Sequence, residues 1–152
     1  MKLYKNGIIT DADKMLSLPA VKYGFGFFES VLYNGSEICH MNRHIKRLKG
    51  SLAEYGCMLE DMDYERHAME VVKANGLEGK RAKININSYE KDEDGSTETS
   101  ISAYEYTNSL QEYRLNIHNR HQISHLNRHK SMNWAHPYLA LKRAIKGGYD
   151  SS

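Results

Sequence analysis

Residues 41 to 55 have the clearest helical pattern in the chain. Apolar residues recur there at helical spacing, at Ile45, Leu48, Leu52 and Tyr55. Charged residues occupy the other faces, and Gly56 is placed to end the helix. Arg47 lies next to the apolar stripe, so its head group can reach inward. The segment is therefore predicted to be an amphipathic helix with a basic side chain at the edge of its apolar stripe.

Strand patterns precede this helix. Residues 23 to 33 join the pair Gly24 and Gly26 to an aromatic and β-branched run, which indicates a strand, and Asn34-Gly35 follows as a turn. No GxGxxG pattern opens a helix here, so a dinucleotide-binding fingerprint is excluded. Farther back, residues 1 to 10 predict two short strands around a turn at Asn6-Gly7, followed by a polar connection over residues 11 to 19.

A second helix and a hairpin are expected after the first helix. The helix is predicted from about Met62 to Ala74, with Asp61 or Asp63 as its cap and a buried stripe formed by Met62, Met69 and Val72. Two segments of alternating polarity then follow, at residues 81 to 88 and 99 to 106. A charged tip joins them, which is typical of a β-hairpin.

Residues 128 to 148 form a polar lead-in that carries Lys130 and then a predicted helix. The helix is expected to begin near Pro137, because proline suits a first helical turn, and to end at Gly147-Gly148. Lys130 therefore lies just before a helix N-terminus, where unpaired N–H groups suit an anion such as phosphate. A solvated surface lysine is the ordinary alternative at such a position.

Composition narrows the class of protein. At 152 residues, with 40% hydrophobic and 26% charged residues, the chain suits a soluble globular protein with a real core. No apolar run is long enough to cross a bilayer, and no signal-like apolar segment follows the N-terminus, so a cytoplasmic protein without membrane partners is predicted. Cys39 and Cys57 are too few for a disulfide framework and are expected to be free thiols.

The net charge of +2 is unevenly distributed. Residues 113 to 149 contain no Asp or Glu, and their positive charges come from Arg114, Arg120, Arg128, Lys130, Lys142, Arg143 and Lys146. Such a block suits nucleic acid or a phosphate-bearing pocket.

Two alternatives use this same block. A metal site can draw on His118, His121, His125 and His129, although no carboxylate lies among them. A nucleic-acid binder can stack bases on Trp134 and Tyr138. Both alternatives have less support in the sequence than a third interpretation, which rests on three stretches that match the pattern of a known family. No nucleic-acid partner is therefore predicted.

The first stretch combines Lys130 and Asn133 with an aromatic residue at 134, Tyr138-Leu139-Ala140, Ala144 and Gly148. The second is the Tyr-Gly-x-x-x-Phe-Glu pattern of residues 23 to 29, and the third is His44-Ile45-Lys46-Arg47-Leu48. Together they resemble the class IV aminotransferases. These are fold-type IV enzymes that depend on pyridoxal 5'-phosphate (PLP), and they include branched-chain aminotransferase and aminodeoxychorismate lyase.

The resemblance implies roles for five residues. Lys130 is the catalytic residue, which forms an imine with the aldehyde of PLP and later acts as the general base. Arg47 holds the PLP phosphate, since a guanidinium can donate two parallel bonds to it. Trp134 stands near the place where the family often has a cofactor-binding tyrosine, and Tyr23 and Phe28 wall the substrate side. A small amino substrate and a homodimer are the implied partners.

The resemblance also implies an α+β fold, with an N-terminal two-layer domain at residues 1 to 110 and the beginning of the lysine-bearing domain at 113 to 152. A strand at residues 113 to 118 is expected to enter that second domain. The family's glutamate for the pyridine nitrogen belongs farther downstream, so the second domain is expected to be truncated. Lys83 and Asn85 stand where family members have arginines, which weakens the expectation of carboxylate recognition.

Aminotransferase and lyase chemistry remain open at this point. An inactive, structural or oligomerising remnant of the family is the alternative.

Overall fold

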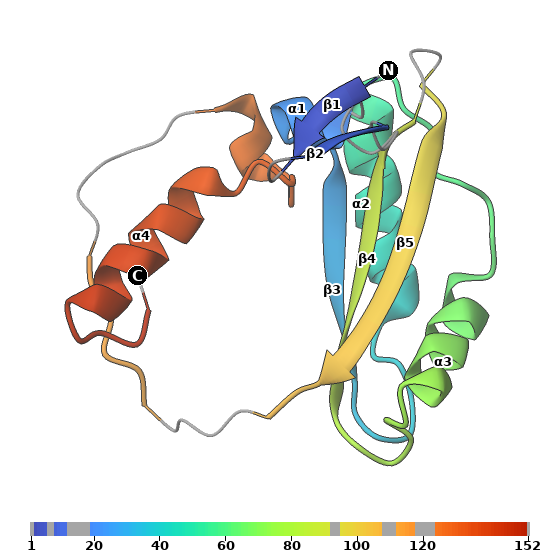
Figure 1. The fold of residues 1–152 in the computed structure, drawn as a ribbon. Helices are drawn as coiled ribbons and strands as arrows, with labels where there is room; N and C mark the ends of the chain where they lie inside the picture. The colour runs from blue at the N-terminus through green and yellow to red at the C-terminus, as the bar shows by residue number, and fades with distance from the viewer. Residues whose placement is uncertain are drawn as a thin grey trace.

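The computed structural model describes residues 2–5, 8–11, 19–91, 95–107, 112–117 and 124–151. Its architecture is α+β, with a helical layer on one face of a small antiparallel sheet (Figure 1). The sheet has the order β3-β4-β5 and is built from β3 (Phe27–Tyr33), β4 (Ala82–Glu90) and β5 (Thr97–Glu105). The predicted β4–β5 hairpin is confirmed, with pairing that extends from Ala82↔Glu105 to Glu90↔Thr97.

Helix α2 (Met41–Glu54) confirms the amphipathic helix predicted there. Its residues Leu48 and Leu52 are fully buried, whereas Ile45 and Tyr55 are partly buried against the same core. The core facing them includes Val31 of β3 and the β4 residues Ile84 and Ile86. Burial of a leucine side chain contributes about 1.5–3 kcal/mol, so Leu48 and Leu52 fix α2 firmly against the sheet.

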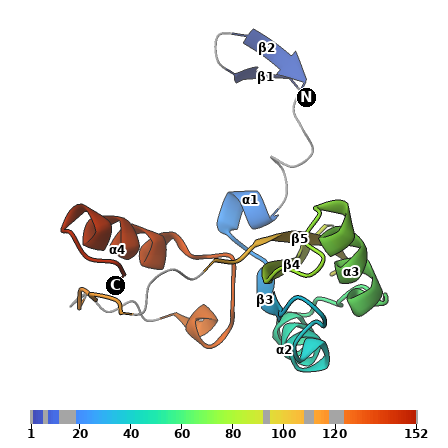
Figure 2. The ribbon, with the colours of Figure 1, turned by 90° about the horizontal axis from the view of Figure 1, so that it is seen from below.

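Helix α3 (Tyr64–Ala74) covers the sheet at β5 (Figure 2). It begins at Tyr64 because the Asp63 side chain accepts a hydrogen bond from the backbone N–H of Arg66 at 3.0 Å and caps the helix there. The predicted start at Met62 and the predicted buried stripe are therefore wrong in part. The buried positions are Tyr64, Ala68 and Val72, while Met62 and Met69 are partly buried beside the core.

The N-terminal hairpin is confirmed as β1 (Lys2–Lys5) paired with β2 (Ile8–Asp11). The turn at Asn6-Gly7 lies outside the described residues. Helix α1 (Pro19–Tyr23) was not expected, because the polar connection was predicted to end at Pro19 and no element was assigned to residues 20 to 22. The strand predicted after Gly24 and Gly26 is confirmed as β3, which begins at Phe27, and Gly24 ends the preceding helix with a φ of 65°.

The C-terminal part contains a short 3-10 helix, η2 (His125–Arg128), and α4 (Ala135–Lys146). Helix α4 begins slightly before the predicted Pro137, which still lies in its first turn and loses no backbone hydrogen bond there. In Figures 1 and 2, α4 lies on the opposite side of β3 from α3.

The strand expected at residues 113 to 118 is not formed within the described residues 112–117. A strand needs a neighbouring strand, and here Leu115 forms only an isolated bridge with Ser151. Arg114 is held instead by Asp150: the backbone N–H of Arg114 donates a hydrogen bond to the Asp150 carboxylate at 2.8 Å. No helix in the described ranges is long and apolar enough to span a membrane.

Candidate functional site

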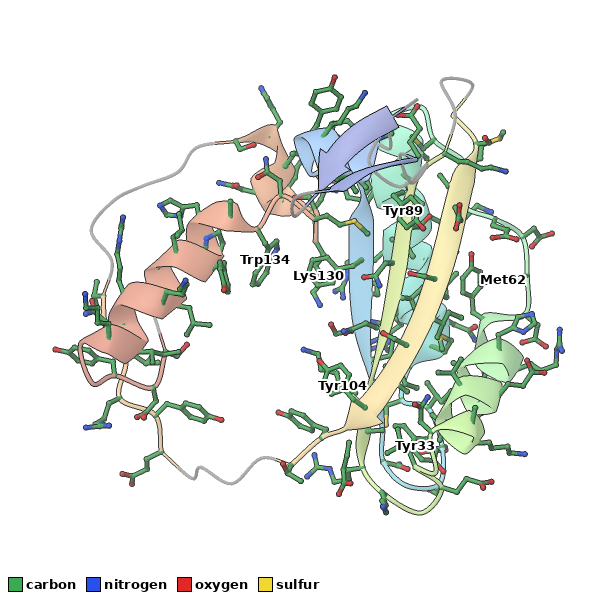
Figure 3. The ribbon with its side chains drawn as sticks, in the orientation of Figure 1. Tyr33, Met62, Tyr89, Tyr104, Lys130 and Trp134 are labelled. Atoms are coloured by element: carbon green, nitrogen blue, oxygen red, sulfur yellow. The ribbon has the colours of Figure 1, made fainter. Side chains whose placement is uncertain are left out.

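The segment that carries Lys130 is attached to the free edge of β3. The backbone N–H of Phe28 donates to the carbonyl oxygen of Lys130, and that of Met132 donates to the carbonyl oxygen of Gly26, both at 2.8 Å. A Cβ atom on Gly26 would lie 2.7 Å from the sulfur of Met132 and 3.1 Å from the carbonyl oxygen of Ser88, so glycine eases this close approach. The backbone of Lys130 is therefore held against β3 (Figure 3).

Glu29 is the polar centre of the site. Alternate residues of β3 face the core, and Glu29 is 1% exposed between Phe27 and Val31. A buried carboxylate needs charged partners. Arg47 supplies two hydrogen bonds, from Nε to Oε1 and from Nη2 to Oε2, both at 2.5 Å. The Nδ1 atom of His44 lies 2.8 Å from Oε2.

Lys130 approaches the same carboxylate, with its Nζ atom 4.0 Å from Oε2 of Glu29. We refer to Glu29, His44, Arg47 and Lys130 as the Glu29 cluster. Burial alone raises the pKa of Glu29, but the hydrogen bonds from Arg47 and His44 and the nearby positive charges bring that pKa below its ordinary value. The cluster thus combines an ionised carboxylate with the cations of Arg47 and Lys130, and the excess positive charge suits an anion.

Arg47 can bind an anion while it holds Glu29. Its two bonds to the carboxylate use Nε and Nη2, and its side chain is 56% exposed. The hydrogen bond to Glu29 raises the pKa of Arg47, which keeps the guanidinium charged. Because a guanidinium is a planar fork of N–H donors, the N–H groups not used by Glu29 remain for a phosphate or carboxylate.

Aromatic side chains lie on the other side of the Lys130 amine from Glu29. The Nζ atom of Lys130 lies 5.3 Å from the centre of the Phe28 ring, which lies on the face of β3 opposite to Glu29. The Phe28 and Trp134 rings meet edge to face at 5.8 Å. Lys130 and Trp134 are both labelled in Figure 3, where they lie between β3 and the start of α4. Lys130 is thus bordered by a charged cluster and by an aromatic pair.

The structure brings together four of the five residues selected from the sequence, namely Arg47, Lys130, Phe28 and Trp134. Tyr23 makes none of the contacts that join them. It is the last residue of α1, and the residue is 72% exposed.

Sequence reasoning did not assign a role to Glu29. The available signal was an acidic residue at an alternate position of an otherwise apolar strand face, which demands a buried partner. His44 was noted only as part of a pattern.

The metal interpretation gains no support from the described part of the chain, where no group of three or more His, Cys, Asp or Glu residues could hold an ion. His118 and His121 lie outside the described residues. His129 is engaged instead with Ser51 and Glu54 of α2.

Known proteins share this arrangement of elements. Branched-chain amino acid aminotransferase from Escherichia coli superposes with a TM-score of 0.75 at 19% identity, covering 95% of this chain and 54% of that one. A 4-amino-4-deoxychorismate lyase described as putative, from Legionella pneumophila, gives 0.71 at 21% identity, covering 86% and 52%. A hypothetical aminotransferase from Mycobacterium tuberculosis in its PLP-bound form gives 0.66 at 14% identity, covering 96% and 56%.

These likenesses define the fold as that of fold-type IV enzymes, and the chain spans about half the length of those structures. A profile of the amino-transferase class IV family matches residues 26–152. The chain therefore belongs to the class IV aminotransferase family. No curated protein sequence matches it significantly.

Proposed function

We propose that this chain carries the cofactor-anchoring part of a PLP-dependent enzyme that acts on an amino acid or an amino-substituted acid, as an aminotransferase or as an aminodeoxychorismate lyase-like enzyme. The observation that supports this most directly is the meeting of Lys130 and Arg47 at one buried carboxylate. An amine can attach to the aldehyde of PLP and a guanidinium can bind its phosphate, so the two residues suit two neighbouring groups of this cofactor.

The donor set fits PLP. Arg47 would bind the phosphate through N–H groups that Glu29 does not use, and Lys130, whose side chain is 38% exposed, offers an accessible amine. Phe28 and Trp134 would provide apolar surface beside the ring. When bound, PLP supplies an electron sink for the carbanion formed at the substrate's α-carbon.

Lys130 would serve as the general base once its amine is free of the cofactor. Glu29 lies 4.0 Å from Nζ and can receive a hydrogen bond from the ammonium form after a small movement. The Phe28 ring beneath Nζ leaves the amine with fewer water contacts on that side. Lys130 thus has a carboxylate acceptor on one side of Nζ and an aromatic ring on the other.

A groove on the open face of the sheet is the candidate substrate site. It has a volume of about 380 Å³ and is lined by Ser30, Leu32, Arg81, Lys83 and Tyr106, among others. Arg81 and Lys83 lie over the rings of Tyr106 and Tyr104 at 5.8 Å and 6.0 Å. These cations could bind a substrate carboxylate, which addresses the doubt raised by the absence of arginines at 83 and 85.

A structural or oligomerising role is a second candidate. It is supported by exposed apolar side chains in the C-terminal part, where Ile117 is 92% and Leu115 is 62% exposed. Such surface favours association with another chain, and a homodimer is the form we propose. This candidate predicts assembly without any PLP absorption band.

The test is a titration of the purified chain with PLP, followed by absorption spectroscopy and size-exclusion chromatography. The proposed function predicts a saturable band from PLP attached to a lysine. Assembly without such a band, at any PLP concentration, would favour the structural role.

A further inference from the structure

One face of α2 carries a stripe of polar residues. His44, Arg47, Ser51 and Glu54 follow one another at helical spacing, so their side chains point the same way from the helix. We call these residues the α2 stripe. Its first half, His44 and Arg47, holds Glu29 of β3. Its second half, Ser51 and Glu54, meets the residues that immediately precede Lys130.

His129 makes most of this second contact. Its side chain is 8% exposed, and its Nδ1 atom lies 3.0 Å from the hydroxyl oxygen of Ser51. Its Nε2 atom lies 3.4 Å from Oε2 of Glu54. The imidazole also meets the rings of Phe27 and Tyr55 edge to face, at 5.7 Å and 5.5 Å. Contacts on every side therefore fix the orientation of His129.

The contacts assign the tautomer of His129. A guanidinium only donates hydrogen bonds, so Nε2 accepts from Nε of Arg128 at 3.3 Å, and Nδ1 carries the proton and donates to the hydroxyl oxygen of Ser51. Burial, and then the charge of Arg128, lower the pKa of His129 and favour this neutral form. Arg128 forms its own ion pair with Glu54. Together, these bonds join residues 128 and 129 to the C-terminal half of α2.

We propose that His129 is a positioning residue: through Ser51 it fixes the spacing between Lys130 and Arg47. The proposal rests on the proposed function, because it assumes that these two residues hold the aldehyde carbon and the phosphate group of one cofactor. Arg47 and Ser51 lie on adjacent turns of α2, about 6 Å apart along the helix axis. The backbone of Lys130 is held by β3 on one side and, through His129, by α2 on the other.

The first test compares Ser51→Ala, which removes the hydroxyl, with Ser51→Thr, which keeps one. Each variant of the full 152-residue chain is incubated with PLP, reduced with borohydride and mapped by mass spectrometry. Loss of one hydrogen bond predicts that Ser51→Ala lowers the rate of Lys130 labelling by about fivefold. Ser51→Thr should restore most of it.

A second readout separates positioning from a general loss of structure. Pyridoxine 5'-phosphate has the phosphate but no aldehyde, so Arg47 can bind it and Lys130 cannot attach to it. Positioning predicts unchanged affinity for this probe in Ser51→Ala. In a parallel pair, His129→Asn, whose amide can stand in for the Nδ1 side of the ring, should retain more labelling than His129→Ala.

The outcomes distinguish the two proposals. Equal labelling of Lys130 in the wild type and in Ser51→Ala would overturn the positioning role and leave the proposed function intact. An equal loss of pyridoxine 5'-phosphate affinity and of labelling would show a merely structural role and also overturn it. Absence of Lys130 labelling in the wild type would overturn the proposed function and, with it, this inference.

Discussion

The Glu29 carboxylate and the Arg47 guanidinium form a two-point ion pair, with both N–O distances at 2.5 Å. The two partners differ in exposure, since the Glu29 side chain is 1% exposed and that of Arg47 is 56% exposed. The buried carboxylate therefore orients a guanidinium that still reaches solvent. An arginine held in this way loses little conformational entropy when an anion binds, because the direction of its side chain is already set.

Replacing Glu29 with Gln should destabilise the fold. The change keeps the size of the side chain but removes charge-assisted bonds to Arg47, and we expect a loss of about 1.5–3 kcal/mol in the free energy of unfolding measured in urea. Glu70→Gln is the matched control, since Glu70 pairs with Arg66 on the surface of α3. A loss in the control as large as that in Glu29→Gln would contradict the assignment of Glu29 as a buried anchor.

Replacing Arg47 should weaken PLP binding without removing attachment at Lys130. We expect Arg47→Ala to raise the dissociation constant by roughly tenfold to a hundredfold, the range of one to two charge-assisted hydrogen bonds. Arg47→Lys keeps the charge near Glu29 and guards against loss of folding, and it should recover part of the affinity. Fluorescence titration measures both variants, and unchanged affinity in both would exclude Arg47 as the phosphate group's partner.

Glycine-to-alanine substitutions at two positions should have opposite effects on stability. Gly95 has a φ of 82°, and a Cβ atom there would lie 2.5 Å from the carbonyl oxygen of Gly56, so Gly95→Ala should cost about 1–3 kcal/mol. Gly50 lies inside α2 with nothing within 4 Å of an added Cβ. Gly50→Ala should therefore stabilise the protein by about 0.5–1 kcal/mol. Thermal unfolding of both variants checks this pair, which fails if their shifts have the same sign.

Stability should rise with pH through the titration of His129. The folded-state pKa of His129 is lowered, so the unfolded chain binds the proton more tightly, and acid favours unfolding. The contribution is complete above the ordinary histidine pKa of about 6.5 and is lost as the pH falls below it. Charged neighbours of the imidazole are Glu54 and Arg128.

His129→Asn removes the titrating ring from this environment. Its free energy of unfolding, measured in urea at a series of pH values, should therefore depend less on pH between about 5 and 7 than that of the wild type. Parallel curves for the two proteins would assign the dependence to other groups.

Much of the fold follows from local pattern. The apolar spacing of α2 and the alternation in β4 and β5 each identify the buried face, because burial is decided residue by residue along one element. The start of α3 was misplaced because the cap depends on which of two aspartates turns its side chain toward the backbone. The strand expected at residues 113 to 118 depended on a neighbouring strand, and pairing is a property of the whole fold.

Only the site residues that belong to a recognisable sequence pattern could be predicted from the sequence. Arg47 and Lys130 came from such patterns, yet their meeting at Glu29 joins three separate elements. The contact between His129 and Ser51 links residues that are 78 positions apart. No local periodicity encodes a pairing of that kind, since it arises when the segment of Lys130 docks on β3 and α2 together.

The most direct test of the account is to identify the lysine that PLP labels. The purified chain is saturated with PLP, reduced with borohydride and digested, and the modified peptide is sequenced by mass spectrometry. The account predicts one saturable adduct on Lys130, which is absent in Lys130→Ala. An adduct confined to another lysine, or equal labelling of the wild type and Lys130→Ala, would contradict it.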